Sequence, residues 1–304
     1  MSSLVVTNIL KEMRKESSYI HHKNSDITKL EIIATELREM VIEMLVEAKS
    51  GHSAGSLGAA DIITSLFFNI LDIDSKDPKF EKRDRFLLSN GHVCPIYYAA
   101  LAKRGFFDKS LLKTFRKVDS TLQGHPHFGS IAGIENTSGP LGQGLSQAVG
   151  LALALSMDTN SSRVYCLGSD GELQEGQTWE AAMFAANNHL TNLTWVIDRN
   201  GIQISGNTEN INGIEPLRNK LEAFGWYVIE VDGHNIEELI NAFNLAKTIT
   251  QRPTVLIAHT IPGKGVSFME GKYQWHGKVP NTDEGKAALK SLRTLEGRLE
   301  VTEY

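Results

Sequence analysis

The fold is decided by the stretch Val164-Tyr-Cys-Leu-Gly-Ser-Asp170-Gly-Glu172 and by Asn192-Leu-Thr-Trp-Val-Ile-Asp-Arg-Asn200-Gly-Ile202 after it. Each stretch begins as an apolar run of strand-forming residues, Val164 to Leu167 and Leu193 to Ile197, and ends in a polar loop. Between them, apolar residues at steps of four, three and four predict a helix packed on a sheet: Trp179, Met183, Ala186 and Leu190. A helical crossover joins parallel strands, so both strands end at the same edge of the sheet.

Asp170 and Asn200 therefore lie just past the carboxyl ends of two strands, the edge at which open α/β sheets bind ligands. Neighbouring strands are about 4.8 Å apart, so the two side chains could share one small cation. Their oxygens, with the Ile202 carbonyl as a third donor, suit magnesium, which prefers oxygen ligands and also accepts phosphate oxygens and water. The alternative is that Asp170-Gly and Asn200-Gly are only turn signals.

The composition describes an ordinary α/β protein with ample core: 304 residues, 41% hydrophobic and 22% charged. A net charge of −5 argues against general nucleic-acid binding. Cys94 and Cys166 suggest neither a disulfide framework nor a zinc site, and we expect reduced thiols in a cytoplasmic protein. No apolar run approaches the roughly 20 residues that span a bilayer, and the N-terminus does not resemble a signal peptide.

The chain reads as one domain, residues 26–304, after an N-terminal extension of residues 1–25 that has one possible short helix. We expect His21-His22 of the extension to have no catalytic role, and Asp26 to cap the first helix of the domain. The domain is predicted to be a parallel sheet with helices on both faces. The further expected elements are a helix over 57–70, strands over 86–88, 226–231 and 254–258, an irregular region over 119–140 and a charged helix over 284–298.

Four histidines lie in loops that this topology could bring together: His52, His92, His125 and His276. Taken singly, each is more often a structural residue than a catalyst. The Gly139-Pro-Leu-Gly-Gln-Gly144 loop opens a helix rich in small residues, and the free amides of its N-terminus could face an anion.

The sequence resembles the transketolase family over most of its length. The thiamine-diphosphate motif of that family is similar to Asp170-Gly-Glu-Leu-Gln-Glu-Gly-Gln-x-Trp-Glu-Ala-Ala followed by Asp198-x-Asn200-Gly. Further transketolase motifs occur in the right order: Lys49-Ser-Gly-His52, Leu88-Ser-Asn-Gly-His92, Gly124-His125-Pro, Ser138-Gly-Pro-Leu-Gly-Gln-Gly144 and His276-Gly. Two departures, Ser169 in place of glycine and the charged Arg199, concern fine loop geometry.

The resemblance implies a role for each matching residue. The magnesium ligands would be Asp170, Asn200 and the carbonyl of Ile202. The thiamine diphosphate would be lined by His92, Gly139, Pro140, Leu141, Gly142, Gly171, Glu172, Asn200 and His276. The catalytic histidines, which would contact the hydroxyls and carbonyl of the donor or line the cofactor, would be His52, His92, His125 and His276. Neutral imidazoles can exchange protons with sugar hydroxyls near pH 7.

Single-chain transketolases are far longer and carry a second α/β domain, which binds the aminopyrimidine and supplies the activating glutamate. The resemblance therefore implies the N-terminal subunit of a split transketolase. Such a chain would be inactive without a C-terminal, pyrimidine-binding subunit, with which it would assemble as α2β2. By this resemblance, the assembled enzyme would transfer a two-carbon ketol unit from a ketose to an aldose. The alternatives are a component of another thiamine enzyme (1-deoxyxylulose-phosphate-synthase-like, oxoacid dehydrogenase or specialised ketol transferase) and a non-catalytic partner. P-loop, dinucleotide-binding and His-Glu-x-x-His motifs are missing.

Overall fold

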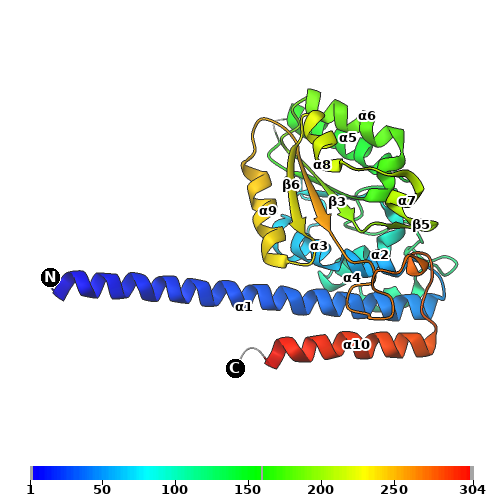
Figure 1. Cartoon of the computed structure of the whole chain (residues 1–304), viewed down its shortest axis with the longest axis horizontal. Helices are drawn as coiled ribbons and strands as arrows, with labels where there is room; N and C mark the ends of the chain where they lie inside the picture. Colours follow the sequence, from blue (N-terminus) through cyan, green and yellow to red (C-terminus); the bar gives the residue numbers. More distant parts are fainter. Residues whose placement is uncertain (1–2, 159, 302–304) are drawn as a thin grey trace.

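The computed structural model of the chain describes residues 3–158 and 160–301, and the side chains of residues 26–158 and 160–294. Its centre is a five-stranded sheet in the order β1-β2-β3-β7-β6, and every neighbouring pair of strands is parallel. The strands are β1 (Arg85–Leu88), β2 (Val164–Ser169), β3 (Leu193–Arg199), β6 (Tyr227–Asp232) and β7 (Thr254–His259). The predicted parallel α/β sheet is confirmed (Figure 1).

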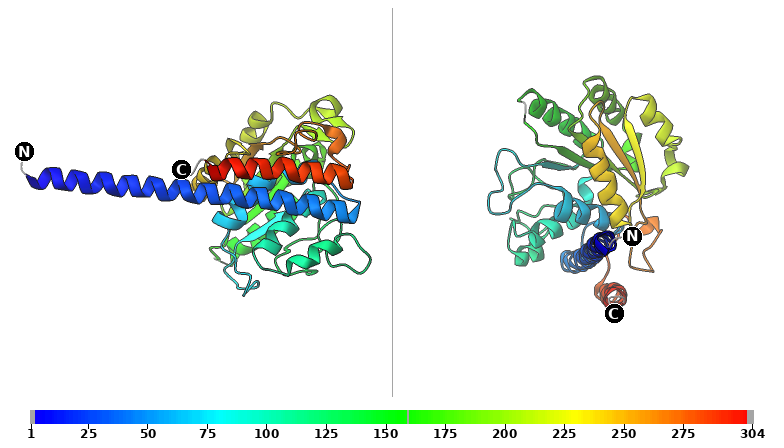
Figure 2. Two further views of the ribbon diagram at one scale, coloured as in Figure 1. Left: turned by 90° about the horizontal axis from the view of Figure 1, so that it is seen from below. Right: turned by 90° about the vertical axis from the view of Figure 1, so that its left-hand side faces the viewer.

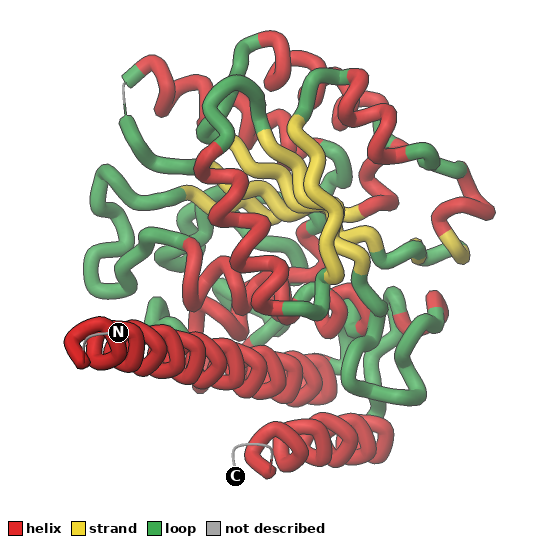
Figure 3. Tube along the Cα trace, turned by 60° about the vertical axis from the view of Figure 1, so that its left-hand side comes forward, coloured by secondary structure: helices red, strands yellow, loops and turns green. Residues whose placement is uncertain are grey.

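Helices cover both faces of the sheet, and successive strand residues point to opposite sides. In β2, Tyr165 and Leu167 join one apolar cluster, whereas Val164 and Cys166 join the other. The first cluster includes side chains of α1 (Ser3–Ala48), α2 (Ala54–Gly58), α3 (Ala60–Ser65), α4 (Cys94–Lys103), α9 (Ile236–Thr248) and α10 (Thr282–Val301). The second includes those of α5 (Gln143–Met157), α6 (Gly176–Asn187) and α8 (Leu217–Ala223). Both faces of β2 are therefore buried and largely apolar, as expected for a parallel strand under helices, whereas the edge strand β6 is partly exposed. Figure 3 shows the sheet between these helices.

The helix bounds follow the expected order with local differences. One more short α-helix is α7 (Thr208–Asn212). A π-helical segment, Leu66–Ile70, ends the region predicted as one helix over 57–70. Two short strands, β4 (Ile202–Gln203) and β5 (Gly206–Asn207), form a small antiparallel pair beyond β3.

The start predicted for the first helix was wrong. The helix α1 is continuous from Ser3 to Ala48, so Asp26 lies inside it, and its carboxylate pairs with Lys29 one turn later instead of capping. The N-terminal part of α1 runs out beyond the body of the chain (Figures 1 and 2). The side chains of His21 and His22 lie outside the described residues, and the domain boundary near residue 25 stays a prediction.

The packing face predicted for α6 was also wrong in part. The side chain of Met183 is 57% exposed, and Leu190 lies beyond the end of the helix. The buried face consists of smaller residues, Thr178, Ala181, Ala182 and Ala185. Small side chains let α6 pack closely against its neighbours. The buried face of α6 is therefore formed by the residues that fit this close packing, and not by its largest apolar side chains.

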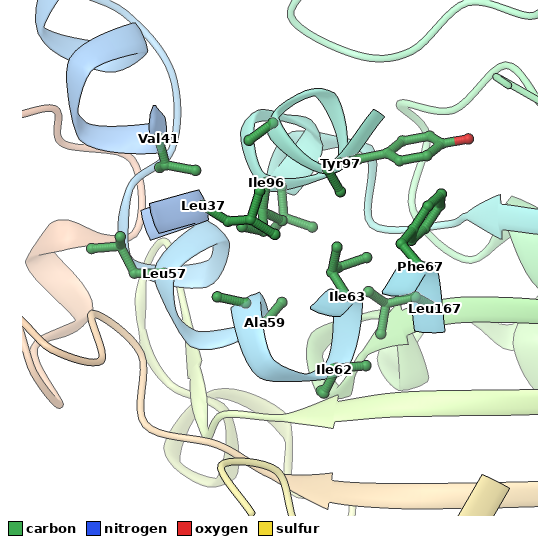
Figure 4. Close-up of a cluster of buried hydrophobic side chains, with 14 of the residues drawn as sticks. Leu37, Val41, Leu57, Ala59, Ile62, Ile63, Phe67, Ile96, Tyr97 and Leu167 are labelled. Atoms are coloured by element: carbon green, nitrogen blue, oxygen red, sulfur yellow. The ribbon is translucent and has the colours of Figure 1, made fainter. Parts of the chain in front are cut away.

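The first apolar cluster connects α1 to the sheet. Figure 4 shows Leu37 and Val41 of α1 among side chains of α2, α3 and α4, with Leu167 of β2 nearby. All of these side chains are buried. The C-terminal end of α1 is thus fixed against the core, and the loop that follows it, which carries His52, begins from a rigid support.

Candidate functional site

The predicted metal ligands lie at the carboxyl ends of two neighbouring strands. The strands β2 and β3 pair in parallel, with Ser169 opposite Asp198, so Asp170 and the loop that follows Arg199 lie side by side. Asp170 is fully buried. Its Oδ2 accepts hydrogen bonds from Arg199 Nη1 and from the Gly201 amide, both at 2.7 Å. Its Oδ1 is buried and has no hydrogen-bond partner among the described residues.

That unpartnered oxygen fits a cation. Burial raises the pKa of Asp170, and the hydrogen bond and charge of Arg199 act in the opposite direction. A buried carboxylate oxygen without a donor is costly, and a bound cation would remove that cost. Among the described residues no three His, Cys, Asp or Glu side chains form a metal-binding group. A cation here would therefore be coordinated by a carboxylate, an amide and a carbonyl oxygen, which are ligands that Mg²⁺ prefers.

Asn200 is oriented by its own neighbours. Its Nδ2 donates to Asp198 Oδ2 at 2.9 Å, and its Oδ1 accepts from the Ile202 amide at 3.0 Å. Asp198 also accepts a hydrogen bond from Thr260 Oγ1. Burial raises the pKa of Asp198 to about 7, although the hydrogen bonds from Thr260 and Asn200 lower it. These contacts fix the Asn200 side chain beside Asp170.

Glu172 accepts a hydrogen bond from the loop Gly139–Gly144, which we call the glycine loop. Its Oε1 accepts from Ser89 Oγ at 2.6 Å and from the Gly142 amide at 2.9 Å, and its Oε2 accepts from the Ser169 amide at 2.9 Å. Burial raises the pKa of Glu172, which is 2% exposed. Through these hydrogen bonds Glu172 joins the end of β1, the end of β2 and the glycine loop.

The conformation of the glycine loop requires glycine. Gly142 has φ +79°, and a Cβ there would lie 2.7 Å from Glu175 Cβ. Gly139 has φ +150°, and a Cβ there would meet His125 at 3.7 Å. These left-handed residues bring the backbone close to the pocket without a side chain in the way.

Three histidine rings converge although their residues are far apart in sequence. The ring centroids of His52 and His92 are 5.1 Å apart, those of His52 and His276 are 5.7 Å apart, and those of His92 and His276 are 5.0 Å apart. Together with His125 they line an open pocket of about 350 Å³, which we call the histidine pocket. The sequence-based prediction that these loops meet is confirmed.

A hydrogen bond between two loops holds this convergence. Ser53 Oγ, next to His52, donates to the Trp275 carbonyl at 3.2 Å, next to His276. The Gly263 amide donates to the Ala54 carbonyl at 2.8 Å, so the loop after β7 is fixed to the start of α2. The two histidine loops are thus joined by their neighbouring residues as well as by the ring contact of His52 with His276.

Burial lowers the pKa of all four histidines. The pKa of His52 falls to about 4, first by burial and then by the charges of His276, Arg116 and His125. Burial also lowers the pKa of His92, His125 and His276. The rings are therefore neutral near pH 7, and each neutral imidazole has one N–H donor and one acceptor nitrogen.

The pocket includes most of the predicted site residues. Its lining contains the predicted residues His52, His92, His125, Gly139, Leu141, Gly171, Asn200, Ile202 and His276. Asp170, Gly142, Glu172 and Pro140 are not on its surface; the side chains of Asp170 and Glu172 are buried. Five further lining residues were not predicted as site residues: Ser169, Gln174, Glu175, Gln203 and Ile204. Gln174 and Glu175 belong to the thiamine-diphosphate motif that begins at Asp170, so the motif could have identified them as site residues.

Comparisons with known proteins identify the family of the chain. The family described as "Transketolase, thiamine diphosphate binding domain" matches residues 29–297. The 6-deoxy-6-sulfo-D-fructose transketolase subunit SqwG of Clostridium sp. (strain MSTE9) is 41% identical over 85% of this chain and 94% of that protein. An apulose-4-phosphate transketolase subunit of Phocaeicola vulgatus is 39% identical over 89% of this chain and 96% of that protein.

Longer relatives match over part of their length. A transketolase structure from Pichia stipitis, in complex with sedoheptulose-7-phosphate, is 33% identical with a TM-score of 0.81, covering 89% of this chain and 41% of that chain. No helix among the described residues is long and apolar enough to span a membrane. The sheet, the site and two relatives matched over nearly their whole length agree: the chain belongs to the transketolase family, as the thiamine-diphosphate-binding N-terminal subunit of a two-chain enzyme.

Proposed function

We propose that this chain supplies one half of an active site that transfers a two-carbon ketol unit from a ketose to an aldose, with thiamine diphosphate and Mg²⁺ as cofactors. The convergence of four neutral histidines in one pocket carries this proposal. A sugar presents several hydroxyl groups, each a donor and an acceptor, and neutral imidazoles can match them and exchange protons with them. His52, His125 and His276 would contact the donor in this way, and His92 and His276 the cofactor.

The metal and the cofactor fit the residues at the strand ends. The free Oδ1 of Asp170 and the ordered Asn200 would hold Mg²⁺ together with the Ile202 carbonyl. The backbone from Gly139 to Gly142, held by Glu172, would line the diphosphate. When bound, thiamine diphosphate supplies the carbanion chemistry that carbon–carbon cleavage requires. This chain's part is to orient the cofactor and to hold or move protons at the imidazole nitrogens.

We propose that the pyrimidine-binding partner completes the site in an α2β2 assembly. The histidine pocket is open, and two side chains at its rim are apolar and exposed, Leu141 at 37% and Ile204 at 69%. Exposed apolar groups beside a catalytic pocket are typical of a surface that another protein covers. A cytoplasmic location belongs to the same proposal; the free, buried thiols of Cys94 and Cys166 support it.

The donor is proposed to be a ketose with an anionic terminal group. The relatives named above act, by their names, on a sulfonated ketose and on a phosphorylated sugar. Both are small sugars with one strongly acidic group at the end remote from the ketol unit, and we propose the same class for this enzyme.

The test is ketol transfer from xylulose 5-phosphate to an aldose phosphate, with added thiamine diphosphate and Mg²⁺. It is run on the purified chain, on its complex with the pyrimidine-binding partner, and on a complex that carries His276→Phe. We expect no activity from the chain alone, and activity in the His276→Phe complex at least about 100-fold below that of the unmodified complex. Activity of the chain alone would contradict the half-site proposal. An inactive complex that still binds both cofactors would contradict ketol transfer from this donor.

A further inference from the structure

We propose that Arg199 is a built-in counter-charge of the metal site: it neutralises Asp170 while the site is empty, so that Mg²⁺ binds with the diphosphate and not on its own. The inference rests on the proposed function and deepens it, because it names a residue of this chain that controls when the cation binds. The motifs that identified the site do not account for a charged residue at this position.

The guanidinium of Arg199 lies at the centre of three carboxylates. Arg199 ends β3 and directly precedes Asn200, and only 11% of its side chain is exposed. Its Nη1 donates to Asp170 Oδ2 at 2.7 Å. Its Nη2 donates to Glu209 Oε1 at 2.7 Å and to Glu215 Oε1 at 3.1 Å. Arg199 therefore connects the predicted metal ligand with two carboxylates of the segment that follows β5.

The two glutamates are held in place by the backbone as well as by Arg199. Glu209 Oε2 accepts a hydrogen bond from the Ile214 amide at 3.2 Å, and Glu215 Oε2 accepts one from the Leu217 amide at 2.7 Å. The Leu217 hydrogen bond, with that from Arg199, lowers the pKa of Glu215, although burial acts in the opposite direction. Without Arg199, three carboxylates would remain close together, and such a cluster attracts a divalent cation.

Arg199 and a cation would use different oxygens of Asp170. Arg199 Nη1 and the Gly201 amide both donate to Oδ2, whereas Oδ1 is buried without a hydrogen-bond partner in the described part of the chain. The guanidinium therefore leaves Oδ1 available to a cation and acts through its charge. A positive charge bonded to a ligand carboxylate repels a second cation, and this repulsion is strong where the groups are buried.

The same charge stabilises the site when no cation is present. Asp170 is fully buried, and an unpaired carboxylate is costly in the interior, so the bond to Arg199 offsets that cost. A lone Mg²⁺ would meet a carboxylate that is already paired. The diphosphate brings further negative oxygens to this edge of the sheet, and phosphate oxygens are ligands that Mg²⁺ accepts. The cation therefore gains enough attraction only when the diphosphate is present.

A purely structural salt bridge would use the same contacts but predicts the opposite effect on the metal. If Arg199 only held Asp170 and the segment 208–217 in place, its removal would disorder the ligand and weaken Mg²⁺ binding. If Arg199 is a counter-charge, its removal leaves the carboxylates without a neutralising charge and strengthens the binding of Mg²⁺ alone. The sign of the change in affinity therefore separates the two roles.

The test measures Mg²⁺ binding by calorimetry in the complex with the pyrimidine-binding partner, without thiamine diphosphate. Arg199→Met should bind Mg²⁺ at least about 10-fold more tightly than the unmodified complex, because the removed charge is bonded to the ligand. Arg199→Lys keeps the charge and should stay within about threefold of the unmodified complex. Adding Asp170→Asn to Arg199→Met should remove the gain, because the cation would lose its carboxylate.

Arg218→Met is the matched control. Arg218 of α8 also pairs with two glutamates, Glu222 at 2.9 Å and Glu230 at 3.4 Å, but neither is a predicted metal ligand. Its removal should change the affinity for Mg²⁺ by no more than about twofold. Unchanged or weaker Mg²⁺ binding in Arg199→Met, or an equal gain in Arg218→Met, would overturn the inference.

A second variant covers the case that Arg199→Met does not fold. Arg199→Met combined with Glu209→Gln keeps the net charge of the cluster. It should still bind Mg²⁺ alone more tightly than the unmodified complex, because the lost positive charge was bonded directly to Asp170. Weaker or unchanged binding would again overturn the inference. Failure of the unmodified complex to bind Mg²⁺ and thiamine diphosphate together would count against the proposed function alone.

Discussion

The contact between Gly144 and Ser89 should make Gly144→Ala strongly destabilising. Gly144 lies in the first turn of α5, and a Cβ there would be 2.4 Å from Ser89 Cβ and 2.5 Å from Ser89 Cα. The Ser89 Cα is a backbone atom that no side-chain rotation can move. The Ser89 amide also donates a hydrogen bond to the Leu167 carbonyl at 2.7 Å, which holds this backbone in place. Carbon atoms pack at about 3.5–4.0 Å, so α5 would have to move from β1 by more than about 1 Å.

The expected cost follows from three terms. Overpacking of this kind costs about 1–3 kcal/mol. Loss of the 3.1 Å hydrogen bond from the Gly144 amide to Ser89 Oγ adds about 1 kcal/mol. The higher helix propensity of alanine returns about 1 kcal/mol, which leaves a net loss of about 1–3 kcal/mol. Because Ser89 also donates to Glu172, the affinity for thiamine diphosphate should fall with stability.

The same helix supplies the control. Gly150 of α5 is exposed, and a Cβ there would meet no atom within 4 Å. Gly150→Ala should therefore stabilise the protein by about 0.5–1 kcal/mol. Urea unfolding of both variants beside the wild type measures the two effects. A Gly144→Ala protein as stable as wild type would refute the close approach of α5 to β1, and an equal change in both variants would show that helix propensity alone was measured.

Three further predictions concern the charged groups of the site. Asp170→Asn should lower Mg²⁺ affinity, measured calorimetrically with thiamine diphosphate present, at least about 10-fold, because the buried ligand loses its charge; unchanged affinity would place the metal elsewhere. Glu172→Gln should lower the free energy of unfolding by about 1–3 kcal/mol, because the new side-chain N–H₂ group would face an N–H or O–H donor where a carboxylate oxygen now accepts. An unchanged free energy of unfolding in urea would contradict the hydrogen bonds assigned to Glu172. The folded-state pKa of His52 is about 4, below the ordinary value of 6.5, so only the unfolded state takes up the proton between these values and stability falls as pH drops from 6.5 to 4. His52→Asn should reduce that loss by about 1–2 kcal/mol, after allowance for partial exposure, and identical pH profiles of unfolding would exclude the effect.

Much of the fold could be predicted from local patterns. The short apolar runs at Val164 and Leu193 each became a central strand, because β-branched and aromatic residues bounded by polar loops have few other stable arrangements. The helical crossover made these strands parallel, and that placed Asp170 and Asn200 at one edge. By contrast, Asp26 was a poor guide to the start of a helix, because a capping residue type also occurs inside helices.

The sequence by itself determined the parallel α/β class, the edge at which the candidate site lies and, through its motifs, most of the residues that line the histidine pocket. Only the tertiary structure showed that Ser53 and Trp275 join two distant histidine loops and that Glu172 supports the glycine loop from behind. The physical reason is the distance along the sequence between the residues that interact. Strand and helix patterns report interactions between near neighbours in the chain, whereas these contacts join residues brought together only when loops from different strands pack against each other.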